Sequence, residues 1–398
     1  MKIFIGILVA IIFVCVGWCF YIKTPEKGSF GYDLKFLQKY HSNLVMLEDA
    51  EAKSKLIILP DYQARVMTSS SAGNEGISYG WINHQLIASG VLQVHINAFG
   101  GEDRFWLGPE GGQFSIFFKK GVDFNFDNWQ VPPSLDTESF DLESVSKNEA
   151  VFSKKIALEN YSGTRFSIFV NRSIRLLSKI KIDSLLGFPT GDDIEFVAYE
   201  TDNVVSNISD QNWDKNTGLL SVWVLGMFKA NEKNTIIIPF KQGYESTLGK
   251  IVTTDYFGDI PQKRLSIGKK AIYLKADANF RSKIGLSPRR ALPCMGSYDA
   301  QNKVLTIVQY SLDTAKTDYV NSKWKIQKQP FAGDVVNAYN DGPVNGKQLG
   351  KFYELESSSP AIALAKGESI RHIHRTMHFK GNKKDLNVIT EKVLGVVI

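Results

Sequence analysis

Short apolar runs separated by turn residues dominate this sequence after residue 47. Such runs, continuous or alternating with polar residues, occupy residues 114–118, 166–170, 219–228, 235–240 and 304–312. Turn-forming residues bound them at 111–112, 192–193, 216–218 and 340–342. The repeat of an amphipathic helix is scarce beyond the N-terminal part. Many short strands without intervening helices predict an all-β protein built as a large antiparallel β-sandwich.

The composition is that of a globular protein with a substantial core. Of the 398 residues, 43% are hydrophobic and 22% are charged, and a chain of this length buries much of its surface on folding. The net charge is only +6, and no run of five basic residues occurs. Nucleic-acid binding needs a concentrated basic surface, so no nucleic-acid partner is predicted.

Three cysteines, Cys15, Cys19 and Cys294, are too few for a disulfide framework. Two of them lie in the N-terminal apolar segment, so the folded domain has no cysteine-based zinc site. We therefore expect core burial to hold the fold and predict no cofactor.

The N-terminal apolar run, residues 3–21, is long enough to cross a membrane. At about 1.5 Å per residue, a helix of this length spans roughly the hydrocarbon core of a bilayer. Trp18 and Phe20 are bulky where a cleavage site requires small residues. We predict a signal-anchor over residues 1–22 and export to the periplasmic side of the cell envelope. A cleaved signal peptide, or a lipoprotein that uses Cys19, is the alternative.

The rest of the chain divides into a linker and one large domain. Residues 23–33 contain Pro25, Gly28 and Gly31 and are predicted to form a polar linker. An amphipathic stretch at residues 34–47 predicts one helical passage. The β-sandwich domain is predicted to cover residues 34–398.

The C-terminal part carries a resemblance to a known superfamily. Residues 353–360 place an acidic residue before a turn, residues 365–368 form a Lys-Gly-Glu turn, and a histidine-rich strand follows from His372 to Phe379. This order resembles the C-terminal end of aldose 1-epimerases, the galactose mutarotases. Together with segments 63–83 and 97–114, it resembles a bacterial exported family of unknown function within that superfamily, over residues 35–398. The resemblance implies large curved sheets whose concave face binds a sugar.

The resemblance also implies roles for two residues. Glu356 matches the general base that acts on the anomeric hydroxyl of the sugar, and Arg104 resembles a substrate-facing arginine. Mutarotases carry a histidine acid before a mid-chain Tyr-Phe-Asn segment, but the comparable residues 197–203 contain no histidine. The acid must therefore come from elsewhere, and His374 and His95 are the candidates.

Glu354 and Glu356 are two residues apart in a predicted strand. Their side chains share one face at a separation of about 7 Å, and two carboxylates this close raise the pKa of one of them. Glu354 is therefore a candidate substrate contact and proton-shuttling group, or a solvated strand residue.

The closing strand places His372, His374, Thr376 and His378 on one face. His372 and His374 could chelate a metal only with a third ligand, such as Glu356 or His95. No metal is predicted, and His372 is instead a candidate sugar contact.

A glycine-rich loop contains a dense polar cluster. Its candidate substrate-binding residues are Glu102, Asp103, Arg104, Trp106 and Glu110. Trp106 could stack on the apolar face of a sugar and Arg104 could bind hydroxyls or a carboxylate. The alternative is a structured turn whose charges pair with one another.

Three functional hypotheses follow, and whether the protein is an enzyme stays open. The leading hypothesis is a carbohydrate-binding protein with epimerase-like architecture that acts at the anomeric carbon of a sugar or oligosaccharide. The second is a non-catalytic carbohydrate-binding envelope protein. The third is a polysaccharide lyase or hydrolase that uses Glu102 or Glu110 with Arg104.

Overall fold

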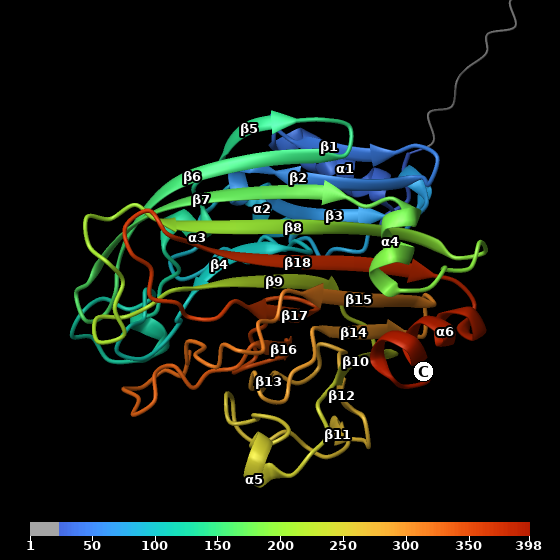
Figure 1. The fold of residues 1–398 in the computed structure, drawn as a ribbon. Helices are drawn as coiled ribbons and strands as arrows, with labels where there is room; N and C mark the ends of the chain where they lie inside the picture. Colours follow the sequence, from blue (N-terminus) through green and yellow to red (C-terminus); the bar gives the residue numbers. More distant parts are fainter. Residues whose placement is uncertain (1–23) are drawn as a thin grey trace, which may run out of the picture.

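The computed structural model describes residues 24–398, which form three antiparallel sheets (Figure 1). The largest has ten strands in the order β11 (Leu265–Ile267), β12 (Ala271–Lys275), β10 (Asn234–Pro239), β14 (Cys294–Asp299), β15 (Val304–Tyr310), β18 (Ser369–Lys380), β8 (Glu195–Asn207), β7 (Arg165–Leu176), β6 (Glu149–Glu159) and β5 (Asp141–Val145). The second has five strands in the order β13 (Ser282–Leu286), β16 (Val336–Asn340), β17 (Phe352–Ser358), β9 (Ser221–Lys229) and β4 (Arg104–Gly108). The third pairs β1 (Val45–Asp49), β2 (Ser54–Leu59) and β3 (Arg65–Ser70). The predicted antiparallel β-sandwich is confirmed.

The two larger sheets pack against each other through their apolar faces. Tyr353 and Leu355 of β17 belong to one buried cluster with Met295 of β14 and Val308 of β15. A strand's side chains alternate between its two faces, so the residues between these apolar ones point to the outer face of the five-stranded sheet. That outer face carries the candidate site.

Helices cover the opposite, outer face of the ten-stranded sheet. The buried cluster there joins α4 (Lys179–Leu186) and α6 (Lys383–Leu394) to Met377 and Phe379 of β18. Neither helix was predicted. The remaining short helices are α2 (His84–Ser89), α3 (Pro133–Asp136) and α5 (Glu245–Leu248).

The predicted linker at residues 23–33 and helix at residues 34–47 had wrong boundaries. The first described helix is α1 (Phe30–Tyr40), and Val45 already begins β1. Ser29 caps this helix, because its hydroxyl accepts a hydrogen bond from the Tyr32 backbone N–H at 3.3 Å. The cap fixes the start of the helix inside the stretch predicted to be linker.

The predicted strand at residues 114–118 was also wrong. This run has no strand structure, although Phe117 and Phe118 are buried. Phe117 packs on Trp106 of β4, with ring centroids 5.3 Å apart. The run is apolar because it covers the outer face of the five-stranded sheet, not because it joins a sheet.

The membrane prediction falls on residues 3–21, which lie outside the described residues, as do Cys15 and Cys19. No helix formed by residues 24–398 has the length and apolar character to cross a membrane. Cys294 is a free cysteine.

Candidate functional site

Strand β17 presents two carboxylates on the outer face of the five-stranded sheet. Glu354 and Glu356 alternate with Tyr353, Leu355 and Ser357, which face the ten-stranded sheet. The two glutamates therefore share one face, as their spacing predicted.

Glu356 is fully buried and makes two polar contacts. The Lys283 ammonium of β13 and the Trp223 indole N–H of β9 each lie 3.0 Å from its Oε2 atom. Its Oε1 atom has no hydrogen-bond partner among the described residues. Burial lowers the pKa of Lys283, but the charges of Glu356, Glu110 and Glu354 outweigh burial and leave this pKa raised. Lys283 therefore stays a cation beside Glu356.

Glu354 pairs with the arginine that the sequence singled out. The Arg104 Nη2 atom donates to Glu354 Oε1 at 2.7 Å, and both side chains are buried. Burial raises the pKa of Glu354 to about 7, with the charge of Arg104 opposing and that of Glu356 adding to the shift. The Arg104 guanidinium also lies over the Trp106 ring, 4.6 Å from its centroid.

Glu110 lies in the turn that follows β4. Its backbone N–H donates to Ser322 Oγ at 3.2 Å, and its carbonyl accepts from Ser115 Oγ at 2.5 Å. Burial raises the pKa of the Glu110 carboxyl; Lys283 opposes this shift and Glu356 adds to it. Lys283 and Glu356, which contact each other on the sheet, thus both influence the pKa of the Glu110 carboxyl.

Residues 321–328, which we call the cover segment, help to close the site. Its Trp324 ring stacks on Trp129, with centroids 5.7 Å apart, and meets Phe118 edge-on at 5.2 Å. The Gln113 side chain binds the backbone of Gln327: it donates to the carbonyl oxygen at 2.9 Å and accepts from the N–H at 3.0 Å. Because Glu356 has no exposed surface, a ligand reaches it only after covering residues move.

Several polar atoms of this enclosed region lack partners. Glu356 Oε1, Arg104 Nε, Trp106 Nε1 and Trp129 Nε1 are all buried without a hydrogen bond within the described protein. An unsatisfied buried polar group costs about 1–3 kcal/mol. Three donors and one acceptor of this region are therefore without partners among the described residues.

Glu102 and Asp103, predicted as substrate contacts, lie away from this site. Glu102 binds Ser69 at 2.8 Å and His378 of β18 at 3.0 Å. Asp103 pairs with Arg172 of β7 at 2.5 Å, with both side chains fully buried. Both acids therefore act within the protein interior, each next to a partner that was distant in sequence.

His372 and His374 also face the interior, as the alternation along β18 requires. Ser357 of β17 lies 2.8 Å from a ring nitrogen of each. Burial lowers the pKa of His372 to about 3 and that of His374 to about 4. Because Ser357 and Glu356 point to opposite faces of β17, the strand separates both histidines from the Glu356 carboxylate.

His95 lies at the margin of the site. Its Nδ1 atom is 2.7 Å from the Trp129 carbonyl oxygen, and its ring packs on Phe126 at 4.5 Å. Trp129 packs on Phe117, which in turn packs on Trp106. A series of contacts through Trp129 and Phe117 thus links His95 to Trp106.

Residues 28–398 match the model of a family described as a family of unknown function, DUF6786. The chain belongs to the DUF6786 family. No curated protein gives a significant match to its sequence.

Solved structures show which fold this DUF6786 protein shares. A candidate aldose 1-epimerase from Escherichia coli K12 aligns at a TM-score of 0.50 and 12% identity, over 84% of this chain and 98% of that one. A galactose mutarotase related enzyme from Lactobacillus acidophilus aligns at 0.46 and 12%, over 85% and 98% of the two chains. A galactose mutarotase-like protein from Lactobacillus casei aligns at 0.45 and 9%, over 84% and 100%. The alignment with the Escherichia coli protein confirms the predicted mutarotase-like fold.

Sequence reasoning missed two residues of the site, Lys283 and Trp223. Neither stands in a recognisable motif, and β13 reaches β17 only through β16. The pairing Asn337–Glu356 between β16 and β17, with Gly285–Asn337 between β13 and β16, brings Lys283 near Glu356. That register is a property of the assembled sheet.

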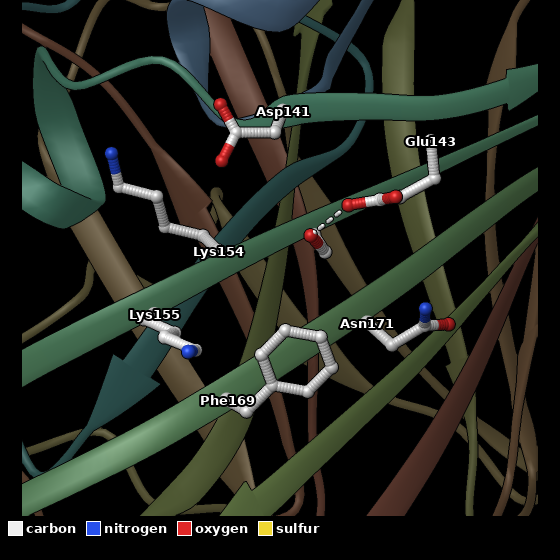
Figure 2. Close-up of a pocket in the computed structure, with 7 residues that line it drawn as sticks. Asp141, Glu143, Lys154, Lys155, Phe169 and Asn171 are labelled. Atoms are coloured by element: carbon white, nitrogen blue, oxygen red, sulfur yellow. Dashed lines mark hydrogen bonds between the residues drawn. The ribbon is translucent and has the colours of Figure 1, made fainter.

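Two other features of the described residues hold no comparable site. No group of three or more His, Cys, Asp or Glu side chains within residues 24–398 is arranged to hold a metal ion. A surface hollow on β5, β6 and β7 is lined by acidic and basic side chains and Phe169, and Ser153 donates a hydrogen bond to Glu143 there (Figure 2). This hollow lies on strands of the other large sheet, not on those that carry Glu356.

Proposed function

We propose that this DUF6786 protein binds a sugar on the outer face of the five-stranded sheet and interconverts its anomers. Glu356 would accept the proton of the anomeric hydroxyl. The observation that carries this proposal is the unpartnered, buried Oε1 atom of Glu356, on the sheet that also carries the unpartnered donors of Arg104 and Trp106 two strands away. The shared fold adds support, because the Escherichia coli protein of that fold is described as a candidate aldose 1-epimerase.

The chemistry of the site suits a sugar better than an apolar ligand. Sugar hydroxyl groups donate and accept hydrogen bonds, so one ring can satisfy both the carboxylate oxygen and the N–H groups. Trp106 and Trp223 meet edge-on at 5.5 Å and provide aromatic surface for the C–H face of a sugar ring. A buried carboxylate is also a suitable general base.

Export to the cell envelope is part of the same proposal. The apolar run at residues 3–21 supports attachment to a membrane. The sugar would then be met outside the cytoplasm.

A second candidate function is sugar binding without catalysis. It is favoured by the contacts of Glu356, whose Oε2 atom is already held by Lys283 and Trp223. A carboxylate held in this way can serve as a fixed acceptor for a hydroxyl group without removing its proton.

Anomer exchange measured by NMR on a panel of common hexoses separates the two functions. We expect the wild-type protein to speed the exchange, and Glu356→Gln to reduce the rate about 100-fold or more, the effect of losing a general base. Glu102→Gln is the matched control, because Glu102 is equally buried but lies in the interior.

Each outcome has a definite meaning. Equal exchange rates in Glu356→Gln and wild type remove Glu356 as the base. Sugar binding by calorimetry without exchange in the wild type favours the second function. Neither binding nor exchange with hexoses or oligosaccharides overturns the sugar proposal.

A further inference from the structure

Anomer exchange needs an acid as well as a base, and this chain lacks a histidine where an acid would be expected. Opening the ring requires a proton on the ring oxygen while the anomeric hydroxyl loses one. Residues 197–203 contain no histidine and form part of β8, in the ten-stranded sheet. The acid must come from another residue, and its identification rests on the proposed function.

Three basic side chains of this region are poorly suited to supply the proton. Strand β17 separates His374 from Glu356, and burial lowers the pKa of His374 to about 4, so its ring is neutral near pH 7. His95 lies in a loop, and its Nδ1–H points at the Trp129 carbonyl oxygen, 2.7 Å away. Lys283 is 3.0 Å from Glu356 Oε2, and its raised pKa makes the ammonium a weak acid.

Glu354 shares the face of β17 that carries the proposed base. It lies two residues from Glu356, and both residues pair with β16 on one side and β9 on the other. Their side chains therefore point the same way, about 7 Å apart. In a pyranose the anomeric hydroxyl and the ring oxygen are bonded to the same carbon. A sugar that lies over this part of β17 thus offers one of these oxygens to each carboxyl group.

Arg104 holds Glu354 in a position from which it can give a proton. The Arg104 Nη2 atom reaches across β9 from β4 and donates to Glu354 Oε1 at 2.7 Å. This is the only hydrogen bond of the Glu354 side chain within the described residues, so the Oε2 atom is free to carry a proton and donate it. The Arg104 cation also stabilises the carboxylate that forms when the proton leaves.

The surroundings of Glu354 keep its carboxyl protonated in weakly acidic solution. Burial raises its pKa to about 7. The charged groups that modify this shift come from β4, β17, β13 and the segment after β16, and are Arg104, Glu356, Lys283 and Asp341. The two cations oppose the shift and the two acids add to it. Tyr339 is opposite Glu354 in β16, but its hydroxyl donates to Asp341 at 2.6 Å.

We propose that Glu354 is the acid that protonates the sugar's ring oxygen, beside Glu356 on the same strand. In the forward step, Glu356 takes the proton of the anomeric hydroxyl and Glu354 gives its proton to the ring oxygen. The bond between the anomeric carbon and the ring oxygen breaks, its electron pair stays on that oxygen, and the open-chain aldehyde forms.

Ring closure reverses the two proton transfers after the aldehyde has rotated. Glu354, now a carboxylate, removes the proton from the former ring oxygen as this oxygen attacks the other face of the carbonyl. Glu356 returns its proton to the carbonyl oxygen. Both glutamates regain their starting states, so atoms and charge balance without a further reactant.

The first test compares Glu354→Gln with Glu356→Gln in the NMR exchange assay, using the hexose that the wild type turns over fastest. The glutamine carbonyl can still accept the Arg104 hydrogen bond, and the amide matches the protonated carboxyl in charge. Glu354→Gln should therefore bind the sugar within a few-fold of wild type but lose about 100-fold or more of the exchange rate. If Glu354 only holds Arg104 in place, this variant keeps the rate.

The pH profile is a readout that a structural role would not move. Exchange by the wild type should fall as pH rises through about 7, where Glu354 loses its proton. Arg104 lowers the pKa of Glu354, so Arg104→Gln should move this alkaline limb to higher pH, whatever its effect on the maximal rate. The wild-type profile tests the proposal even where a variant fails to fold.

The outcomes separate this inference from the proposed function. Exchange lost in Glu356→Gln but kept in folded Glu354→Gln overturns Glu354 as the acid and leaves the function standing. A wild-type rate that does not fall above pH 7, or an alkaline limb that stays in place in Arg104→Gln, also overturns it. A wild-type protein without exchange activity overturns both.

Discussion

At the scale of single residues, Glu354 and Glu356 show how different the partners of two identical side chains on one strand can be. They occupy one strand face, but Glu356 has an ammonium group and an indole N–H on one oxygen, whereas Glu354 has one arginine. Burial penalises the charged form of a carboxyl, and only close partners reverse that penalty. Glu354 is consequently the carboxyl of β17 whose protonation we expect to change near neutral pH.

The stability of the protein should therefore fall as pH rises through the titration of Glu354. Its pKa is raised from the usual 4.5 to about 7 in the folded state. The folded form holds its proton longer than the unfolded form, so this contribution is complete below pH 4.5 and lost as pH passes 7. The difference between the folded and unfolded pKa values corresponds to about 3 kcal/mol in the free energy of unfolding. Relative to wild type, Glu354→Gln should gain stability between pH 5 and pH 8 in urea unfolding. A difference that is constant with pH would contradict the raised pKa.

At the scale of elements, a glycine turn determines how closely the cover segment approaches. A Cβ atom on Gly111 would lie 2.5 Å from the Lys323 carbonyl oxygen and 2.7 Å from that of Ser322. These are backbone atoms, so a side chain at this position forces the segment outward. The turn after β4 and the cover segment consequently depend on each other, although about 200 residues separate Gly111 from Lys323 in the chain.

Gly111→Ala should destabilise the protein by about 1–3 kcal/mol, the range for overpacking a fixed backbone contact. It should also speed proteolytic cleavage within residues 321–328. Gly191→Ala is the matched control, because its added Cβ would meet only Ile194, at an ordinary 3.9 Å. Urea unfolding measures both variants, and equal stabilities would show that Lys323 does not pack against this turn.

The sequence predicted strands well where one face is buried and the neighbouring strand is close. The alternation along β18 predicted that its three histidines share one face of that strand. The spacing of Glu354 and Glu356 predicted that both share one face of β17. It failed at residues 114–118, because a buried covering loop is as apolar as a strand. It also missed α4 and α6, which are short helices whose apolar residues are explained only by the sheet they cover.

At the scale of the whole molecule, the fold could be predicted but the full site could not. Periodicity and turn residues are local, and they sufficed for a large antiparallel sandwich. The pairing of Lys283 with Glu356 depends on the register across three strands, and the pairing of Asp103 with Arg172 depends on packing between sheets. Such contacts join residues 73 and 69 positions apart, and no single-sequence pattern records them.

The C-terminal helix α6 also depends on contacts between distant parts of the chain, because its buried residues pack on the ten-stranded sheet. Leu386 is fully buried in a cluster with Ile307, Met377 and Phe379 of the ten-stranded sheet, and Figure 1 shows α6 near β14 and β15. Leu386→Ala should lower the free energy of unfolding by about 2–5 kcal/mol, since it removes buried methyl groups and leaves a cavity. Val388 lies on the same helix with 47% of its surface exposed, so Val388→Ala should change stability by about 0.5 kcal/mol or less. Urea unfolding of the full chain compares the two. Similar losses in both variants would mean that α6 is not docked on the sheet, and the apolar outer face of β18 would then need another cover.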